Sequence, residues 1–170
     1  MGYWLRNPLA LLAEGAGGGL VVENGQIIEF VATGKQPTTP VAEWFDASRH
    51  IIIPGLNNTH HHVFQTSSRA HPQGINKELF PWLTALMPIW GRLDRGMFGL
   101  AARLAMTGLL MSGCTTALDH NYLVLSGIED ATDIEVEEEC NLGIRATISR
   151  GGIVAVEKRW RHPAQSHGAG

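Results

Sequence analysis

The sequence has only two cysteines, Cys114 and Cys140, which is too few for the disulfide framework of a small secreted protein. Both lie in segments whose pattern predicts burial, so we expect reduced thiols and a cytoplasmic protein. Neither sign of charge dominates, because 13 basic and 16 acidic side chains leave a net charge of -3. We therefore expect no nucleic acid as a partner. Long hydrophobic runs are also lacking; none reaches the ~18 residues of a membrane-spanning helix, and we expect no membrane partner.

The chain has an ordinary globular composition, with 44% hydrophobic residues, and its pattern begins with strands. Residues 19–33 predict a β-hairpin, because two apolar stretches flank Asn24-Gly25, a pair that adopts the positive φ angles of a type I′ turn. Residues 50–53 are apolar without alternation, which is typical of a strand covered on both faces in a parallel sheet. Three consecutive histidines, His60 to His62, follow at the C-terminal end of this predicted strand.

Helices and strands alternate after the histidines. Asp94 is suited to cap a helix that ends before Gly113, and the β-branched run after this glycine predicts a strand. This order is typical of βα units on a parallel α/β sheet. The predicted elements are a broken helix over 77–92, a helix over 95–111, a strand over 114–120, a helix over 131–141 with Glu135 and Glu137 to Glu139 on a solvated face, and a strand over 144–149.

The spacing of the histidines indicates a metal site. Residues i and i+2 of a strand share a face, so His60 and His62 can point into one cavity while His61 turns away. Two imidazoles on one face suit a divalent ion such as Zn²⁺ or Fe²⁺. The alternative is a polar loop, because this spacing alone does not specify a site.

The stretch PGLNNTHHH, residues 54–62, resembles the metal-binding signature of the amidohydrolase superfamily. NTHHHVFQTSSRA, NKELFPWL and SGCTTALDHNYL narrow the resemblance to the cytosine-deaminase-related branch, and within it to the 8-oxoguanine deaminases, often labelled hydroxydechloroatrazine ethylaminohydrolase-like. The likeness covers about residues 3–150. It implies the N-terminal part of a metal-dependent (β/α)₈ barrel preceded by strands of a small β-sandwich. The implied division is a β-sandwich segment over 1–50, the first βα units over 51–150 with IIIPG as barrel strand one, and a divergent tail over 151–170.

The resemblance also implies roles for particular side chains. His60 and His62 match the family's two metal ligands after the first barrel strand, and Gln65 matches an amide that contacts a purine-like ring. His120 and Tyr122 end the second predicted strand, where the loops of a barrel carry substrate-binding residues. Structural alternatives stay open: Gln65 can be a polar residue at a helix start, and His120 can make a structural hydrogen bond.

The activity implied by the resemblance is hydrolytic deamination of an aminated purine-like heterocycle, 8-oxoguanine to urate and ammonia, with one divalent ion, Zn²⁺ or Fe²⁺. Removal of an alkylamine from a triazine ring is the alternative within this class, and a catalytically inactive remnant is the alternative outside it. The family's remaining ligands and catalytic side chains have no counterpart in these 170 residues, so the catalytic residues are unassigned and the chain alone is expected to be inactive. Full-length relatives are implied to be homo-oligomers.

The last residues depart from the family pattern. Glu157-Lys158 is followed by RWRHPA, where the family pattern resembles DGGLPP. When the reading frame is shifted by a single base, the two guanines that end the Trp160 codon begin a glycine codon. The neighbouring codons then permit a sequence close to the family pattern. We therefore hypothesise a shifted frame from about Arg159 onward, which the nucleotide sequence tests.

Overall fold

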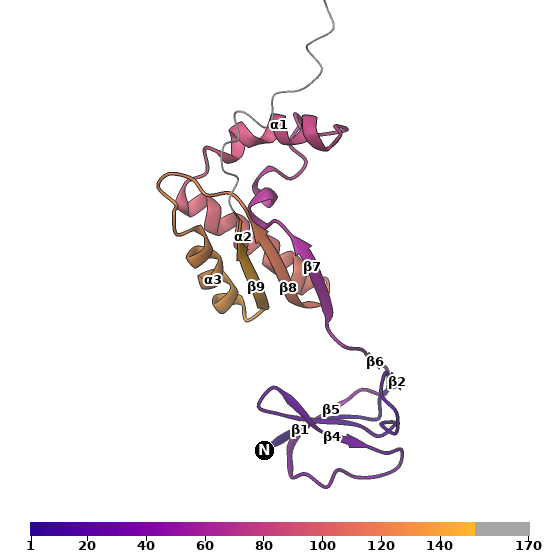
Figure 1. The fold of residues 1–170 in the computed structure, drawn as a ribbon. Helices are drawn as coiled ribbons and strands as arrows, with labels where there is room; N and C mark the ends of the chain where they lie inside the picture. The colour runs from indigo at the N-terminus through magenta and orange to yellow at the C-terminus, as the bar shows by residue number, and fades with distance from the viewer. Residues whose placement is uncertain (152–170) are drawn as a thin grey trace, which may run out of the picture. The chain divides into compact units, whose positions relative to one another are not determined.

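A computed structural model describes residues 1–151, which form a mixed α/β structure (Figure 1). The chain divides into two compact units, one ending at Pro54 and the other beginning at Gly55. The predicted tail over 151–170, with the hypothesis of a shifted frame, lies outside the described residues apart from Gly151. Within residues 1–151, no helix combines the length and apolar character needed to cross a bilayer.

The first unit consists of short strands. They are β1 (Gly2–Arg6), β2 (Ala10–Leu11), β3 (Gly19–Glu23), β4 (Gln26–Val31), β5 (Val41–Asp46) and β6 (Ile51–Ile52). Four of them form a sheet in the order β4-β3-β1-β5, around a core of Trp4, Val21 and Val31. The predicted hairpin is confirmed, because β3 and β4 pair antiparallel around Asn24 and Gly25, whose φ angles are 51° and 75°.

The prediction that residues 51–53 form the strand leading to the histidines is wrong. Ile51–Ile52 is β6, which pairs with β2 in the first unit, and the side chain of Ile51 is 61% exposed. The strand that carries the histidines starts after Pro54-Gly55, as β7 (Leu56–His61). Proline lacks the N–H that a strand ladder requires, so Pro54 separates the two strands. The compact unit that contains β7 begins at Gly55.

The second unit is a parallel sheet with helices, as the sequence predicts. Its strands lie in the order β7-β8-β9, with β8 (Cys114–Asn121) parallel to both neighbours. The other elements are β9 (Arg145–Arg150), the 3₁₀ helix η1 (Val63–Ser68), α1 (Leu79–Trp90), α2 (Arg95–Met111) and α3 (Ala131–Leu142). Ala102 and Met106 of α2 pack with Ala117 of β8, and α3 lies beside α2 (Figure 1).

The helix boundaries follow local chemistry. The Asp94 side chain accepts a hydrogen bond from the N–H of Met97 at 2.8 Å, which confirms the predicted cap of α2. Gly143 ends α3 with a left-handed φ of 71°. The helix predicted over 77–92 is present as α1, but the break predicted in it is wrong, because α1 is continuous. Pro81 lies in its first turn, where no N–H is needed, and Pro88 lies near its end, where one missing bond is tolerated.

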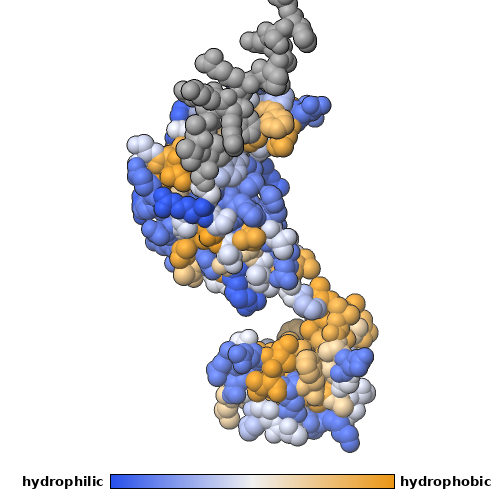
Figure 2. All heavy atoms as spheres, viewed as in Figure 1, coloured by the Kyte–Doolittle hydropathy of each residue, from blue (hydrophilic) through white to orange (hydrophobic). Residues whose placement is uncertain are grey.

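The core of the second unit joins η1, α1, α2 and α3 through buried side chains, among them Phe64, Trp90 and Phe98. Cys114 is buried as expected, but the predicted burial of Cys140 is wrong, since it lies on the exposed side of α3. Hydrophobic side chains are also exposed on both units (Figure 2). Such exposure is common on protein surfaces and identifies no partner by itself.

Candidate metal and substrate site

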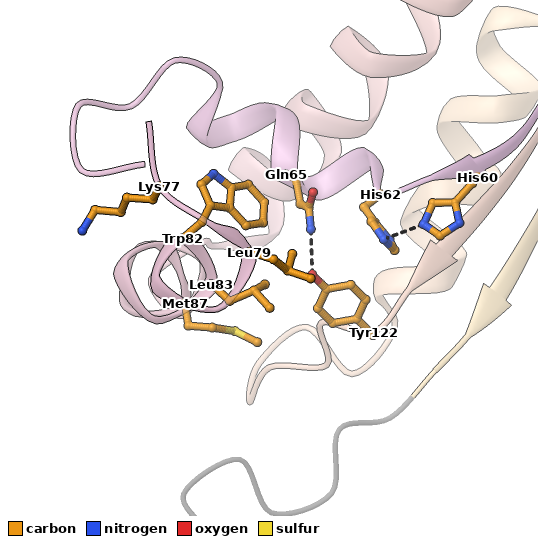
Figure 3. A pocket seen from close by; sticks show the side chains of 9 residues that line it. All are labelled: His60, His62, Gln65, Lys77, Leu79, Trp82, Leu83, Met87 and Tyr122. Atoms are coloured by element: carbon orange, nitrogen blue, oxygen red, sulfur yellow. Dashed lines mark hydrogen bonds between the residues drawn. The ribbon is translucent and has the colours of Figure 1, made fainter. Parts of the chain in front are cut away.

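The three histidines lie where β7 ends. His60 and His61 are its last residues, and His62 immediately precedes η1. The Nε2 atoms of His60 and His62 are 3.2 Å apart (Figure 3). The Nδ1 of His61, between them, is buried and has no hydrogen-bond partner within residues 1–151. The prediction that the outer two histidines share a face is therefore confirmed, whereas their role as metal ligands stays a prediction.

The ring of His62 is held by the neighbouring strand. Its Nδ1 lies 2.7 Å from the backbone oxygen of His120. A carbonyl can only accept, so Nδ1 carries the proton and Nε2 keeps the lone pair, which faces the Nε2 of His60 and is the atom that could bind a cation. Metal-binding histidines commonly have such an oxygen partner on their second nitrogen. The pair of converging Nε2 atoms thus fits a divalent ion, with His60 and His62 as the residues that would hold it.

The other predicted site residues gather around this pair. The ring centroid of His120 lies 4.8 Å from that of His60, and the Tyr122 ring meets the His62 ring edge-on at 5.0 Å. Gln65, in η1, donates from Nε2 to the hydroxyl of Tyr122 at 2.6 Å. The structure therefore brings Gln65, His120 and Tyr122 together with the histidines; their contact with a substrate stays a prediction.

A hollow of about 810 Å³ opens beside the histidines (Figure 3). Helix α1 forms its apolar wall with Trp82, Leu83 and Met87, opposite the polar pair Gln65 and Tyr122. The remaining lining residues are His60, His62, Lys77 and Leu79. An apolar, partly aromatic wall facing a few polar groups suits a flat heterocycle. Sequence reasoning did not single out Lys77, which lies in a loop segment without any local signal.

The imidazole pair has no third ligand in the part of the chain that the structure describes. Within residues 1–151, no three histidine, cysteine, aspartate or glutamate side chains are grouped so as to hold a metal ion. A catalytic zinc ion usually has three protein ligands and an open position. The described residues therefore provide two donors of such a site.

A group of buried polar side chains lies behind the site and was missed by the sequence analysis. Asp119, Asn121 and Glu135 have exposed fractions of 1%, 1% and 0%. The expectation that Glu135 belongs to a solvated face is wrong. The same holds for Glu138, which is 7% exposed and accepts hydrogen bonds from the guanidinium of Arg103 at 2.6 and 2.8 Å. Both glutamates lie on the inward side of α3.

Burial changes the protonation of this group. Removal from water, and then the charge of Asp119, raise the pKa of Glu135 well above its usual range. Burial also raises the pKa of Asp119, but the hydrogen bond from the N–H of Val63 opposes this change. The proton is therefore held by Glu135, while Asp119 acts as the acceptor.

This shift predicts an alkaline loss of stability. Above pH 7 a glutamate is ionised in the unfolded chain but Glu135 keeps its proton in the folded state, so the free energy of unfolding falls by up to about 1.4 kcal/mol per pH unit. His61, whose pKa burial lowers, does not contribute in this range because it is neutral in both states. Glu135→Gln should flatten the slope in urea unfolding between pH 7 and 9, and Glu137→Gln, at an exposed position of α3, should not. Equal slopes in all three proteins would contradict the assignment.

Comparison with known proteins identifies relatives of this chain. The sequence profile of the Amidohydrolase family matches residues 51–162. The chain is 49% identical to 8-oxoguanine deaminase from Pseudomonas aeruginosa over 165 residues, which cover 95% of this chain and 37% of that protein. It is 39% identical over 123 residues to an isoxanthopterin deaminase from an unknown prokaryotic organism, covering 71% of this chain and 26% of that protein.

A solved structure shares the fold. A mutant of atrazine chlorohydrolase TrzN from Arthrobacter aurescens TC1, complexed with zinc and atraton, superposes with a TM-score of 0.74 at 20% identity, over 87% of this chain and 35% of that one. The chain thus spans between 26% and 37% of the length of these proteins. The profile match over residues 51–162, together with the sequence identity to the two deaminases, shows that this chain belongs to the metal-dependent amidohydrolase family.

Proposed function

We propose that this chain supplies the N-terminal part of a hydrolase that deaminates an aminated purine-like heterocycle, with 8-oxoguanine as substrate. Water replaces the amino group on the ring, so that 8-oxoguanine and water give urate and ammonia. The observation that carries the proposal is the convergence of His60 and His62 beside a hollow with an aromatic wall. The 49% identity to an 8-oxoguanine deaminase supports the choice of substrate.

His60 and His62 would hold one divalent ion, Zn²⁺ or Fe²⁺. When bound, such an ion makes a water molecule acidic enough to act as a nucleophile near neutral pH. The chain's own residues orient the substrate. Because Gln65 donates to the oxygen of Tyr122, the Tyr122 hydroxyl proton and the Gln65 carbonyl remain available. A donor next to an acceptor complements the C=O and N–H of a lactam edge, which 8-oxoguanine has.

The architecture follows from the same proposal. β7, β8 and β9 are the first three strands of a (β/α)₈ barrel, and the sheet of the first unit belongs to a small β-sandwich. Parallel barrels carry their chemistry at the C-terminal ends of the strands, which is where His62, His120 and Tyr122 lie. We place the enzyme in the cytoplasm as a homo-oligomer, with a small heterocycle as its partner.

A chimera tests the function. Residues 1–151 of this chain replace the matching N-terminal part of the Pseudomonas aeruginosa 8-oxoguanine deaminase, and urate and ammonia are followed with 8-oxoguanine, guanine and a triazine alkylamine as substrates. We expect 8-oxoguanine to be deaminated, His60→Ala and His62→Ala to abolish turnover, and His61→Ala to preserve it. A folded, zinc-loaded chimera that prefers the triazine would overturn the substrate assignment.

The chain alone is expected to release no ammonia from 8-oxoguanine in the presence of Zn²⁺ or Fe²⁺. The described residues provide only two imidazole donors, and hydrolysis also requires groups that move the proton to the leaving amine. Turnover by the purified chain that disappears in His60→Ala would show instead that the 170 residues are competent.

A further inference from the structure

Asp119 connects the buried polar group to the segment that carries the histidines. Its Oδ1 accepts a hydrogen bond from the N–H of Val63 at 2.7 Å, and Val63 directly follows His62. The His62 ring donates to the backbone oxygen of His120, the residue after Asp119. Two successive residues of β8 therefore hold the two successive residues that follow β7, one through a side chain and one through a carbonyl.

Glu135 acts on Asp119 from the side of α3. Glu135, Asp119 and Asn121 are all buried, and each has side-chain polar atoms without a hydrogen-bond partner within residues 1–151: both oxygens of Glu135, one oxygen of Asp119 and the Nδ2 of Asn121. Two buried carboxyl groups in contact cannot both be ionised without a large cost. Because the Val63 N–H favours the ionised form of Asp119, the proton belongs on Glu135. Glu135 can then donate to the second oxygen of Asp119, which has no other partner among the described residues.

We propose that Glu135 is a positioning residue: its buried carboxyl group fixes Asp119, and Asp119 fixes the backbone at Val63 so that His62 points into the hollow. The inference rests on the proposed function in that His62 serves there as a metal ligand. The positioning role of Glu135 differs from a packing role. A hydrocarbon side chain of similar size would fill the same space but would give Asp119 no hydrogen-bond donor.

Two measurements on the full chain test this role, and the first needs no metal. Amide hydrogen exchange at Val63, followed by NMR, reports its bond to Asp119, and the affinity for Co²⁺, with the cobalt absorption spectrum, reports the arrangement of the imidazoles. The variants are Glu135→Met, which keeps the volume, and Glu135→Gln, which keeps a donor. Glu137→Met, at an exposed position of the same helix, is the control.

We expect Glu135→Met to speed exchange at Val63 and to weaken Co²⁺ binding, each by about tenfold or more, with an altered cobalt spectrum. Glu135→Gln and the Glu137 control should match the parent chain. Unchanged exchange at Val63 in a folded Glu135→Met protein overturns the proposal, and so does a Glu135→Gln variant as impaired as the methionine variant. If Glu135→Met does not fold, Glu135→Asp, which withdraws the acid by one methylene, should change both measurements in the same direction.

The metal site of the proposed function and the positioning role of Glu135 are contradicted by different results. If His62→Ala leaves Co²⁺ binding unchanged, the metal site of the proposed function is wrong, and exchange at Val63 still decides whether Glu135 positions this segment. If His62→Ala abolishes binding while Glu135→Met changes neither measurement, the metal site stands and the positioning role is wrong.

Discussion

Replacing His62 by alanine is expected to lower the affinity of this chain for Zn²⁺ by on the order of a hundredfold. Changes to groups that merely orient a metal ligand already cost 10 to about 100-fold. Loss of His62 would remove one of the two proposed ligands outright and break up the pair of converging Nε2 atoms. Competition with a chromophoric chelator measures the change, and the same variant should lose the cobalt absorption bands of a nitrogen-ligated ion.

His61→Ala is the matched control for this experiment. It removes an imidazole from the adjacent position, and strand alternation is expected to turn that side chain away from the pair formed by His60 and His62. Its Zn²⁺ affinity should equal that of the parent chain. Equal losses in the His61 and His62 variants would mean that all three rings bind the metal interchangeably, as in a flexible polyhistidine segment, and the site described above would be wrong.

Replacing Phe64 by alanine is expected to lower the free energy of unfolding of the second unit by about 3–5 kcal/mol. The side chain is 0% exposed, and its ring meets those of Trp90 and Tyr122 edge-on at centroid distances of 5.3 and 5.1 Å. The truncation leaves a cavity where η1, α1 and the end of β8 meet. Urea unfolding, followed by circular dichroism and by tryptophan fluorescence, measures the effect.

Two further variants serve as controls for the loss of stability expected in Phe64→Ala. Phe64→Leu keeps most of the volume and should cost less than about 1.5 kcal/mol. Phe30→Ala, in the first unit and at a position that is 52% exposed, should cost less than about 1 kcal/mol. If Phe64→Ala unfolds at the same urea concentration as Phe30→Ala, the aromatic cluster does not hold the second unit together.

Local signals in the sequence predicted much of the fold. The turn at Asn24-Gly25, the cap at Asp94 and the glycine that ends α3 each require a particular residue type, so they could be located without tertiary information. The alternation of a strand placed His60 and His62 on one face in the same way. The beginning of β7 could not be found like this, because LNNTHH borders the site and has the polar composition of a loop.

The burial of Glu135 was missed although a signal existed. Ala131, Ile134, Glu135 and Glu138 follow the i, i+3, i+4, i+7 spacing of one helix face, and all four are buried. Grouping the glutamates by their charge concealed this spacing. Only the tertiary structure shows why acids are tolerated there: Arg103 pairs with Glu138, and Glu135 retains a proton. Polar residues at core-facing positions thus mark the neighbourhood of the site.

The two imidazoles of the site are not equivalent. The bond from Nδ1 of His62 to the His120 carbonyl prevents its ring from turning over, whereas no hydrogen bond from a described residue other than His62 restrains the ring of the exposed His60. His62 is thus the rigid member of the pair and His60 the adjustable one. In the proposed metal site, adaptation to ions of different radius would fall to rotation of a single side chain, which would favour tolerance of several divalent cations over strict selection among them.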